Sequence, residues 1–99
     1  MRWDPAQYAR FSDERSRPFF DLAGRIDASK PGLVVDLGCG SGELTATLAE
    51  RWPAAQVRGF DSSADMIERA SGGDRLSFER AEAADFDATG VDVLISNAL

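Results

Sequence analysis

Three glycines and an aspartate have the types and spacing of a site that binds a nucleoside. Gly38, Gly40 and Gly42 directly follow an apolar run, and glycines there permit a sharp turn and close approach of a ligand to the main chain. Asp61 comes 19 residues after Gly42, at the end of a second apolar run. A carboxylate in that place can accept hydrogen bonds from the hydroxyls of a ribose. Together the two features predict a nucleoside ligand.

The spacing of the glycines distinguishes between nucleoside ligands. A dinucleotide site has the pattern Gly-x-Gly-x-x-Gly, with pyrophosphate at the helix N-terminus, whereas this chain has Gly-x-Gly-x-Gly. Glu43, in the first helical turn, would repel pyrophosphate but not a cationic cofactor. Asp36 is costly to bury within an apolar strand, so we expect it near the cationic cofactor, bonded to loop amides, or both. An NAD-dependent oxidoreductase is therefore a disfavoured alternative.

Composition and charge restrict the class of protein. The 99 residues carry a net charge of −6 and are 43% hydrophobic, which fits one small globular domain. With no histidine and a single cysteine, Cys39, the chain excludes a Cys/His zinc site, an internal disulfide and histidine acid–base catalysis.

The distribution of charge and apolar residues bears on location and partners. Residues 33–99 hold five basic and twelve acidic side chains, a balance that repels nucleic acid. No apolar run approaches the roughly 20 residues of a membrane span, and the start lacks the apolar stretch of a signal peptide. We therefore expect a cytoplasmic protein without nucleic-acid or membrane partners.

Apolar spacing predicts helices first and then alternating strands and helices. A helix is expected to open near Pro18, after a shorter helical piece over residues 5–11. A helix over residues 43–51 should end before Pro53, and Ser62, with an acid three residues on, should cap a helix that runs to about residue 70. The first helix should bury Phe19, Leu22, Ala23 and Ile26, and the second Leu44, Thr47 and Leu48. Strands are expected over residues 33–37, 56–60, 76–80 and 92–96.

This alternation predicts an α/β fold, the first half of a Rossmann-like parallel sheet in the strand order 3-2-1-4. Residues 1–32 would form an N-terminal helical lid segment and residues 33–99 the half-domain that binds the ligand. The ligand crevice is expected outside the carboxyl ends of the first and fourth strands. The fourth strand would be an uncovered edge, so either more chain follows or the chain self-associates there.

Two sets of residues in this chain match patterns of known proteins. Residues 34–45, Asp61 and Glu82 resemble the motifs of class I S-adenosylmethionine-dependent methyltransferases. A second set is similar more narrowly to the N-terminal part of trans-aconitate 2-methyltransferases: residues 3–8, Phe11, Arg15, residues 17–19, Asp21, Leu22, residues 61–66 and 96–99. The resemblance runs through essentially the whole chain and implies that S-adenosylmethionine is the cofactor and that the methyltransferase domain is incomplete.

The resemblance also implies a role for each matching residue. Asp61 would hold the ribose, and Glu82, followed by Ala83, would receive the adenine amino group. Asp36, Gly38, Cys39 and Gly40 would line the methionine portion, Ser62 and Met66 would lie beside the nucleoside, Asn97 would face the methyl donor, and Tyr8, Phe11 and Arg15 would contact the acceptor.

Some of these residues have structural alternatives that the sequence leaves open. Met66 could be helix core, Cys39 a small loop residue, and Asn97 the cap of a turn. Tyr8 and Phe11 could simply pack the first helix onto the sheet.

The implied acceptor is a small polycarboxylic acid such as trans-aconitate. A carboxylic acid with a pKa of about 4 is already ionised at neutral pH and needs no base or metal to react. The absence of histidine is therefore compatible with this reaction. Methylation of amide or adenine nitrogen is disfavoured because Ala98 and Leu99, rather than two prolines and an aromatic residue, follow Asn97. A noncatalytic nucleoside-binding fragment that associates through its fourth strand is the alternative.

Overall fold

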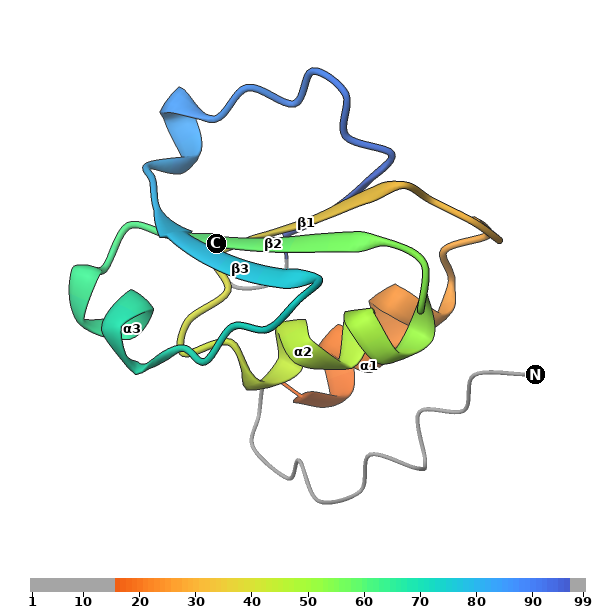
Figure 1. Ribbon diagram of the computed structural model, residues 1–99, viewed down its shortest axis with the longest axis horizontal. Coiled ribbons are helices and arrows are strands. Elements are labelled where there is room, and N and C mark those ends of the chain that lie inside the picture. The colour runs from red at the N-terminus through yellow and green to blue at the C-terminus, as the bar shows by residue number, and fades with distance from the viewer. Residues whose placement is uncertain (1–15, 97–99) are drawn as a thin grey trace.

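The computed structural model describes residues 16–96. Four strands and three α-helices alternate along this part of the chain, and a short 3₁₀ turn follows the third strand (Figure 1). The elements in order are α1 (Ser16–Gly24), β1 (Leu33–Leu37), α2 (Glu43–Arg51), β2 (Gln56–Asp61), α3 (Ala64–Arg69), β3 (Leu76–Arg80), η2 (Ala83–Asp85) and β4 (Val93–Ser96).

The four strands form one parallel sheet in the order β3-β2-β1-β4, which confirms the predicted fold class. β1 lies at its centre and is buried from Val34 to Leu37, which explains its almost continuous apolar sequence. In the register of the sheet, Leu37 pairs with Phe60 of β2 and with Ser96 of β4. The carboxyl ends of β1, β2 and β4 therefore meet at one edge.

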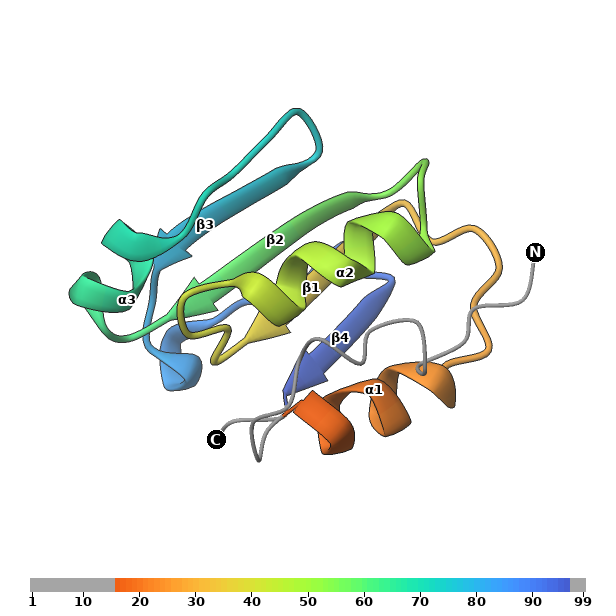
Figure 2. The ribbon, with the colours of Figure 1, turned by 90° about the horizontal axis from the view of Figure 1, so that it is seen from below.

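One face of the sheet is covered by α1 and α2, as Figure 2 shows. Phe19 and Ala23 of α1 and Leu48 of α2 pack with Val34 and Val57 in the main hydrophobic core. Burial of these side chains is the main driving force that fixes the helices on the sheet. None of the helices within residues 16–96 is both long enough and apolar enough to cross a membrane.

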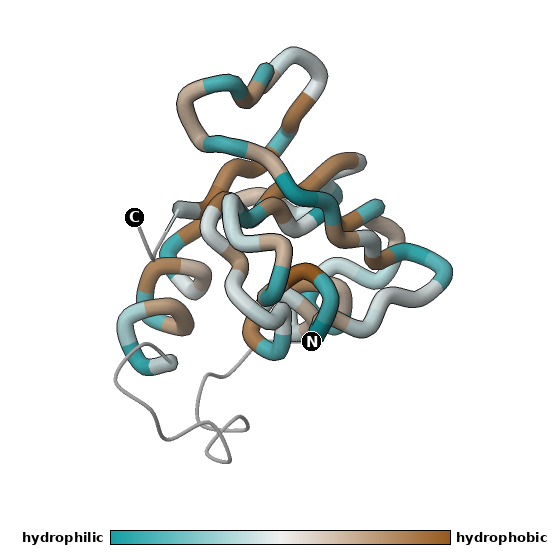
Figure 3. Tube along the Cα trace, turned by 90° about the vertical axis from the view of Figure 1, so that its left-hand side faces the viewer, coloured by the Kyte–Doolittle hydropathy of each residue, from teal (hydrophilic) through white to brown (hydrophobic). Residues whose placement is uncertain are grey.

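The other face is covered by the connection between β3 and β4, residues 81–92, which includes η2. Phe86 from this connection packs on Phe60 with a ring-centroid distance of 5.1 Å, and Val35 and Leu37 complete a second, smaller core. Figure 3 shows apolar stretches, in brown, gathered at the sheet between its two coverings. Leu94 of β4 lies beyond this cover and is 47% exposed.

Hydrogen bonds of two aspartates shape the β3–β4 connection. Asp92 accepts the backbone amides of Gly32 and Leu33 at 2.8 and 2.9 Å, which ties the end of the connection to the start of β1. Within the connection, the Thr89 hydroxyl and then the Thr89 amide bond to Asp87 and hold the pKa of that carboxyl below its ordinary value.

Several details of the predicted helices were wrong. Leu22 of α1, predicted to be buried, is 39% exposed. α1 ends at Gly24, so Ile26 packs against the core from the segment after the helix rather than from the buried face of the helix itself. The N-cap of α3 is Ser63, not Ser62, because the Ser63 hydroxyl accepts the Met66 amide at 3.3 Å. Two adjacent serines offer the same capping chemistry, and the one that caps the helix, Ser63, also donates its amide to the Asp61 carboxylate.

Two arginines bind carbonyl oxygens at the ends of helices. Arg51 donates to the carbonyl of Ala23 in the last turn of α1 and to that of Ile26 just beyond the helix, and partial burial lowers the pKa of Arg51. Arg75 donates to the carbonyls of Ala49, Trp52 and Ala55 at 3.0–3.2 Å, at the end of α2. Carbonyls in the last turn of a helix have no partner within it, so a cation there stabilises the helix end.

We expect Arg75→Met to lower the free energy of unfolding by about 1–3 kcal/mol, because the aliphatic stem stays while three partly buried carbonyls lose a charged donor. Urea unfolding followed by circular dichroism measures this. The matched control is Arg69→Met, which removes only an exposed ion pair with Asp65 and should cost less than about 0.5 kcal/mol. Equal losses in both variants would contradict the role of Arg75.

Candidate functional site

The loop between β1 and α2, residues 38–42, has the backbone that its sequence predicts. Gly38, Gly40 and Gly42 have φ values of 77°, 60° and 89°, in the left-handed region. Side chains other than glycine are strained there, so the alternation of glycines follows from the path of the chain. This loop is called the glycine loop below.

Most amides of the glycine loop bond to acceptors within the protein. The Gly38 and Cys39 amides donate to the carbonyl of Phe60 at 2.7 and 3.0 Å, and the Gly42 amide donates to the carbonyl of Cys39 at 3.2 Å. The Gly40 amide donates to the Asp61 carboxylate. A pyrophosphate-binding loop needs its amides for the ligand, so these four bonds argue against a dinucleotide site.

Asp61 joins the glycine loop to the start of α3. Its Oδ2 accepts the Gly40 amide and its Oδ1 accepts the Ser63 amide, both at 2.9 Å. A carboxylate has about four acceptor positions, so each oxygen can accept one further hydrogen bond. The side chain is therefore held in a fixed position and still suits a ligand with two neighbouring hydroxyl groups.

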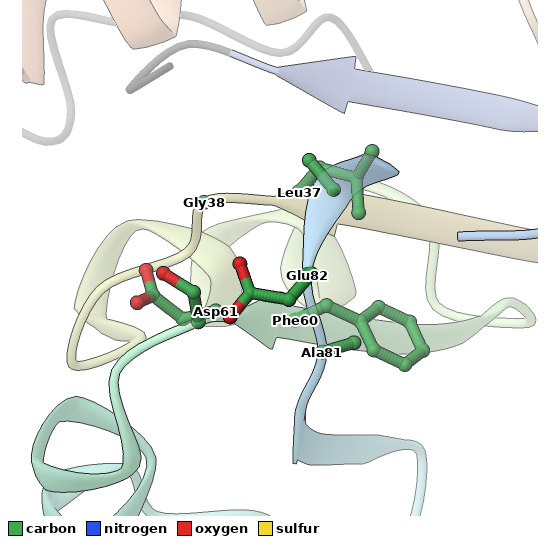
Figure 4. Close-up of a pocket in the computed structure, with 8 residues that line it drawn as sticks. Leu37, Gly38, Phe60, Asp61, Ala81 and Glu82 are labelled. Carbon is green, nitrogen blue, oxygen red and sulfur yellow. The ribbon is translucent and has the colours of Figure 1, made fainter. Parts of the chain in front are cut away.

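A pocket of about 240 Å³ lies beside Asp61, at the carboxyl ends of β1, β2 and β3. In Figure 4 the Glu82 side chain extends from the segment after β3 toward the side of the pocket that holds Asp61. Its lining residues are Leu37, Gly38, Phe60, Asp61, Ser62, Ala81, Glu82 and Ala83. Five of them, Gly38, Asp61, Ser62, Glu82 and Ala83, are among the predicted cofactor residues.

This pocket lies on the β2 and β3 side of β1. The sequence predicted a crevice outside the carboxyl ends of the first and fourth strands; the residues that follow β4 lie outside the described part of the chain, so that position stays a prediction. The pocket described here is bordered by Ala81 to Ala83 of the β3–β4 connection, at the ends of β1 and β2.

The charge of the pocket favours a neutral or cationic ligand. Two of the eight lining residues are charged, Asp61 and Glu82, and both are negative. Arg80 approaches Glu82 only to 4.0 Å in an exposed ion pair, which weakens the negative potential little. An anionic phosphate would be repelled here, whereas hydroxyl and amino groups find acceptors.

Three lining residues were missed by sequence reasoning: Leu37, Phe60 and Ala81. Each one directly precedes a predicted residue, Gly38, Asp61 or Glu82. Apolar residues at strand ends look like core, and Phe60 does pack on Phe86 as core. The available signal was their position at the carboxyl end of a parallel strand, where ligands bind.

Four predicted cofactor residues lie outside the lining. Asp36 is 3% exposed and accepts the Thr45 hydroxyl at 2.6 Å on the α2 side of the sheet. Cys39 is buried in the glycine loop, and Gly40 acts through its bond to Asp61. Met66 is half-buried on α3. The roles predicted for these residues stay predictions.

Thr45 is a buried residue that the sequence did not single out. It lies one helical position past the predicted inward-facing Leu44, which is only partly buried. The spacing of nine residues between Asp36 and Thr45 would have predicted their contact only if both were already known to lie on the same face of the sheet.

The predicted cofactor residue Asn97 and the predicted acceptor residues Tyr8, Phe11 and Arg15 lie outside the described residues.

The residues of the pocket fit the adenosyl part of S-adenosylmethionine. Asp61 retains acceptor capacity for hydroxyls, Glu82 can accept from an amino group, and Phe60 and Leu37 offer apolar surface. The glycine at position 38 lets a ligand reach the main chain at the pocket wall.

Comparison with known proteins gives the family of the chain. Residues 34–99 match the model of the family described as "Methyltransferase domain". A trans-aconitate 2-methyltransferase from Rhodococcus jostii (strain RHA1) is 48% identical over 98 residues, which are 97% of this chain but 38% of that relative.

Solved structures share the fold. A complex between the Haloferax volcanii Trm112 methyltransferase activator and a methyltransferase matches with a TM-score of 0.72 and 27% identity, over 93% of this chain and 42% of that chain. The plantazolicin methyltransferase BpumL, in complex with SAH, matches with a TM-score of 0.59 and 21% identity, over 93% and 44% of the two chains. The chain therefore belongs to the family of methyltransferase domains, and its cofactor is S-adenosylmethionine.

Proposed function

We propose that the chain is the cofactor-binding part of a methyltransferase that O-methylates a carboxylate of a small polycarboxylic acid such as trans-aconitate. The observation that supports the binding part is the acidic pocket, in which Asp61 ends β2 and Glu82 follows the neighbouring parallel strand β3. The acceptor is supported by the relative from Rhodococcus jostii, of which this chain spans a little over a third.

Different residues of the pocket bind different parts of S-adenosylmethionine in this proposal. Asp61 accepts hydrogen bonds from the ribose hydroxyls with the acceptor positions that Gly40 and Ser63 leave open. Glu82 accepts from the amino group of the adenine. Gly38 and its neighbours in the glycine loop border the methionine portion, because they lie at the end of β1, between the pocket and α2.

The chemistry proposed for the acceptor demands little of the protein. When bound, S-adenosylmethionine supplies a methyl group on a positively charged sulfur. A carboxylate acceptor is already ionised, so the protein need only align the two reactants and exclude water. Arg15 is proposed to hold the acceptor through a bidentate contact, with Tyr8 and Phe11 beside it.

Isothermal titration calorimetry tests the cofactor directly. We expect S-adenosylhomocysteine to bind with measurable heat and NADH to give none, because the loop amides are engaged and the pocket is negative. Binding of NADH without S-adenosylhomocysteine would overturn the proposal in favour of an oxidoreductase.

We expect Asp61→Asn to weaken the binding of S-adenosylhomocysteine by about 10- to 100-fold, since charge-assisted hydrogen bonds contribute about 1.5–3 kcal/mol each. The cause is the loss of charged acceptors for both the ribose and the Gly40 amide. Calorimetry measures the affinity. Asp65→Asn, an exposed carboxylate four positions along the chain, serves as the control and should bind as the unaltered chain does.

For the acceptor, we expect Arg15→Ala to raise KM for trans-aconitate by at least about tenfold, as loss of a charge-assisted contact would, with little change in affinity for the cofactor. Methyl-transfer assays on the protein with trans-aconitate and with its monomethyl ester measure this. Arg17→Ala is the neighbouring control. Equal KM values for Arg15→Ala and the unaltered protein would remove Arg15 from the acceptor site.

A second candidate function is a noncatalytic nucleoside-binding module that associates through β4. It is favoured by the position of β4 at an edge of the described sheet and by the exposure of Leu94. Sedimentation of the chain distinguishes the two, since this candidate requires association and the enzyme does not.

A further inference from the structure

Phe78 of β3 lies against two glycines, Gly42 of the glycine loop and Gly59 of β2. It pairs with Gly59 in the register of β2 and β3. A Cβ atom on Gly59 would meet Phe78 Cδ1 at 2.7 Å, and one on Gly42 would meet Phe78 Cε1 and Cζ at 2.5 Å. Real Cβ atoms do not approach carbon so closely, so the ring occupies the space that both glycines leave empty.

Both glycines are connected to the glycine loop. Gly42 ends the loop and is the N-cap of α2, with a φ of 89°. Gly59 lies under the loop, because a Cβ there would also come within 3.0 Å of Cys39 Sγ. No left-handed φ requires glycine at position 59, so close packing is the physical reason for it.

We propose that Phe78 is a positioning residue for the glycine loop. Its ring supports the loop from β3 and keeps the distance between Gly42 and β2 fixed. The Gly40 amide is thereby held at Asp61, and the Gly38 and Cys39 amides at the Phe60 carbonyl. Phe78 does not line the pocket, so it acts on the ligand only through the loop. The effect on ligand affinity rests on the function proposed above.

The first test is Phe78→Leu, which removes the planar ring. We expect faster hydrogen exchange at the amides of the glycine loop. We also expect S-adenosylhomocysteine to bind about tenfold more weakly, because affinity falls with the fraction of molecules whose loop has the binding-competent conformation, and we expect that fraction to fall to about one tenth. The matched control is Leu76→Ala, on the same strand and face, which packs against the main core. It should lower thermal stability and leave both loop exchange and affinity unchanged.

A second test uses the contact with Gly59. Gly59→Ala places a methyl group against the ring, so we expect it to loosen the loop in the unaltered chain. Combined with Phe78→Leu, its added effect on loop exchange and affinity should be much smaller, because the more flexible side chain can move aside. Additive effects of the two substitutions would contradict the proposal.

The outcomes separate this inference from the proposed function. If S-adenosylhomocysteine does not bind the unaltered chain, the proposed function fails, and loop exchange in Phe78→Leu still decides the role of Phe78. If Phe78→Leu and Leu76→Ala change loop exchange and affinity alike, the ring is only part of the core and the inference is overturned.

Discussion

The site depends on the Asp61 carboxylate, which bonds to two segments that are separate in the sequence. One oxygen accepts the Gly40 amide of the glycine loop and the other accepts the Ser63 amide before α3. A carboxylate bonded in this way has a fixed orientation and retains acceptor positions for a ligand. The same charge that holds the loop therefore defines what the pocket can bind.

Electrostatics and main-chain geometry favour the same kind of ligand. The amides of the glycine loop are used within the protein, and the pocket beside it carries two carboxylates. A dinucleotide site has the opposite character, with open amides and a positive helix terminus for phosphate. The difference lies in a few hydrogen bonds on a shared fold, which is why the fold alone would not decide the ligand.

Several residues that hold this arrangement do not touch the pocket. Arg75 binds the carbonyls that end α2, Asp92 ties the β3–β4 connection to β1, and Phe78 fills the space above Gly59. Each contact joins segments that are distant in the sequence. The precision of the site thus comes from elements around it that restrict the glycine loop and the connection carrying Glu82.

The sequence by itself determined the order of elements, the parallel sheet and the glycine loop, because apolar periodicity and glycine conformation are local properties. It also pointed to Asp61 through its position at the end of a predicted strand, and to Glu82 through the resemblance to class I methyltransferases. Only the tertiary structure decided that Phe60 and Leu37 line the pocket, that Thr45 meets Asp36, and that Phe78 packs on two glycines. These contacts depend on register and on which face of the sheet each side chain occupies, and no local pattern encodes the distance between such residues.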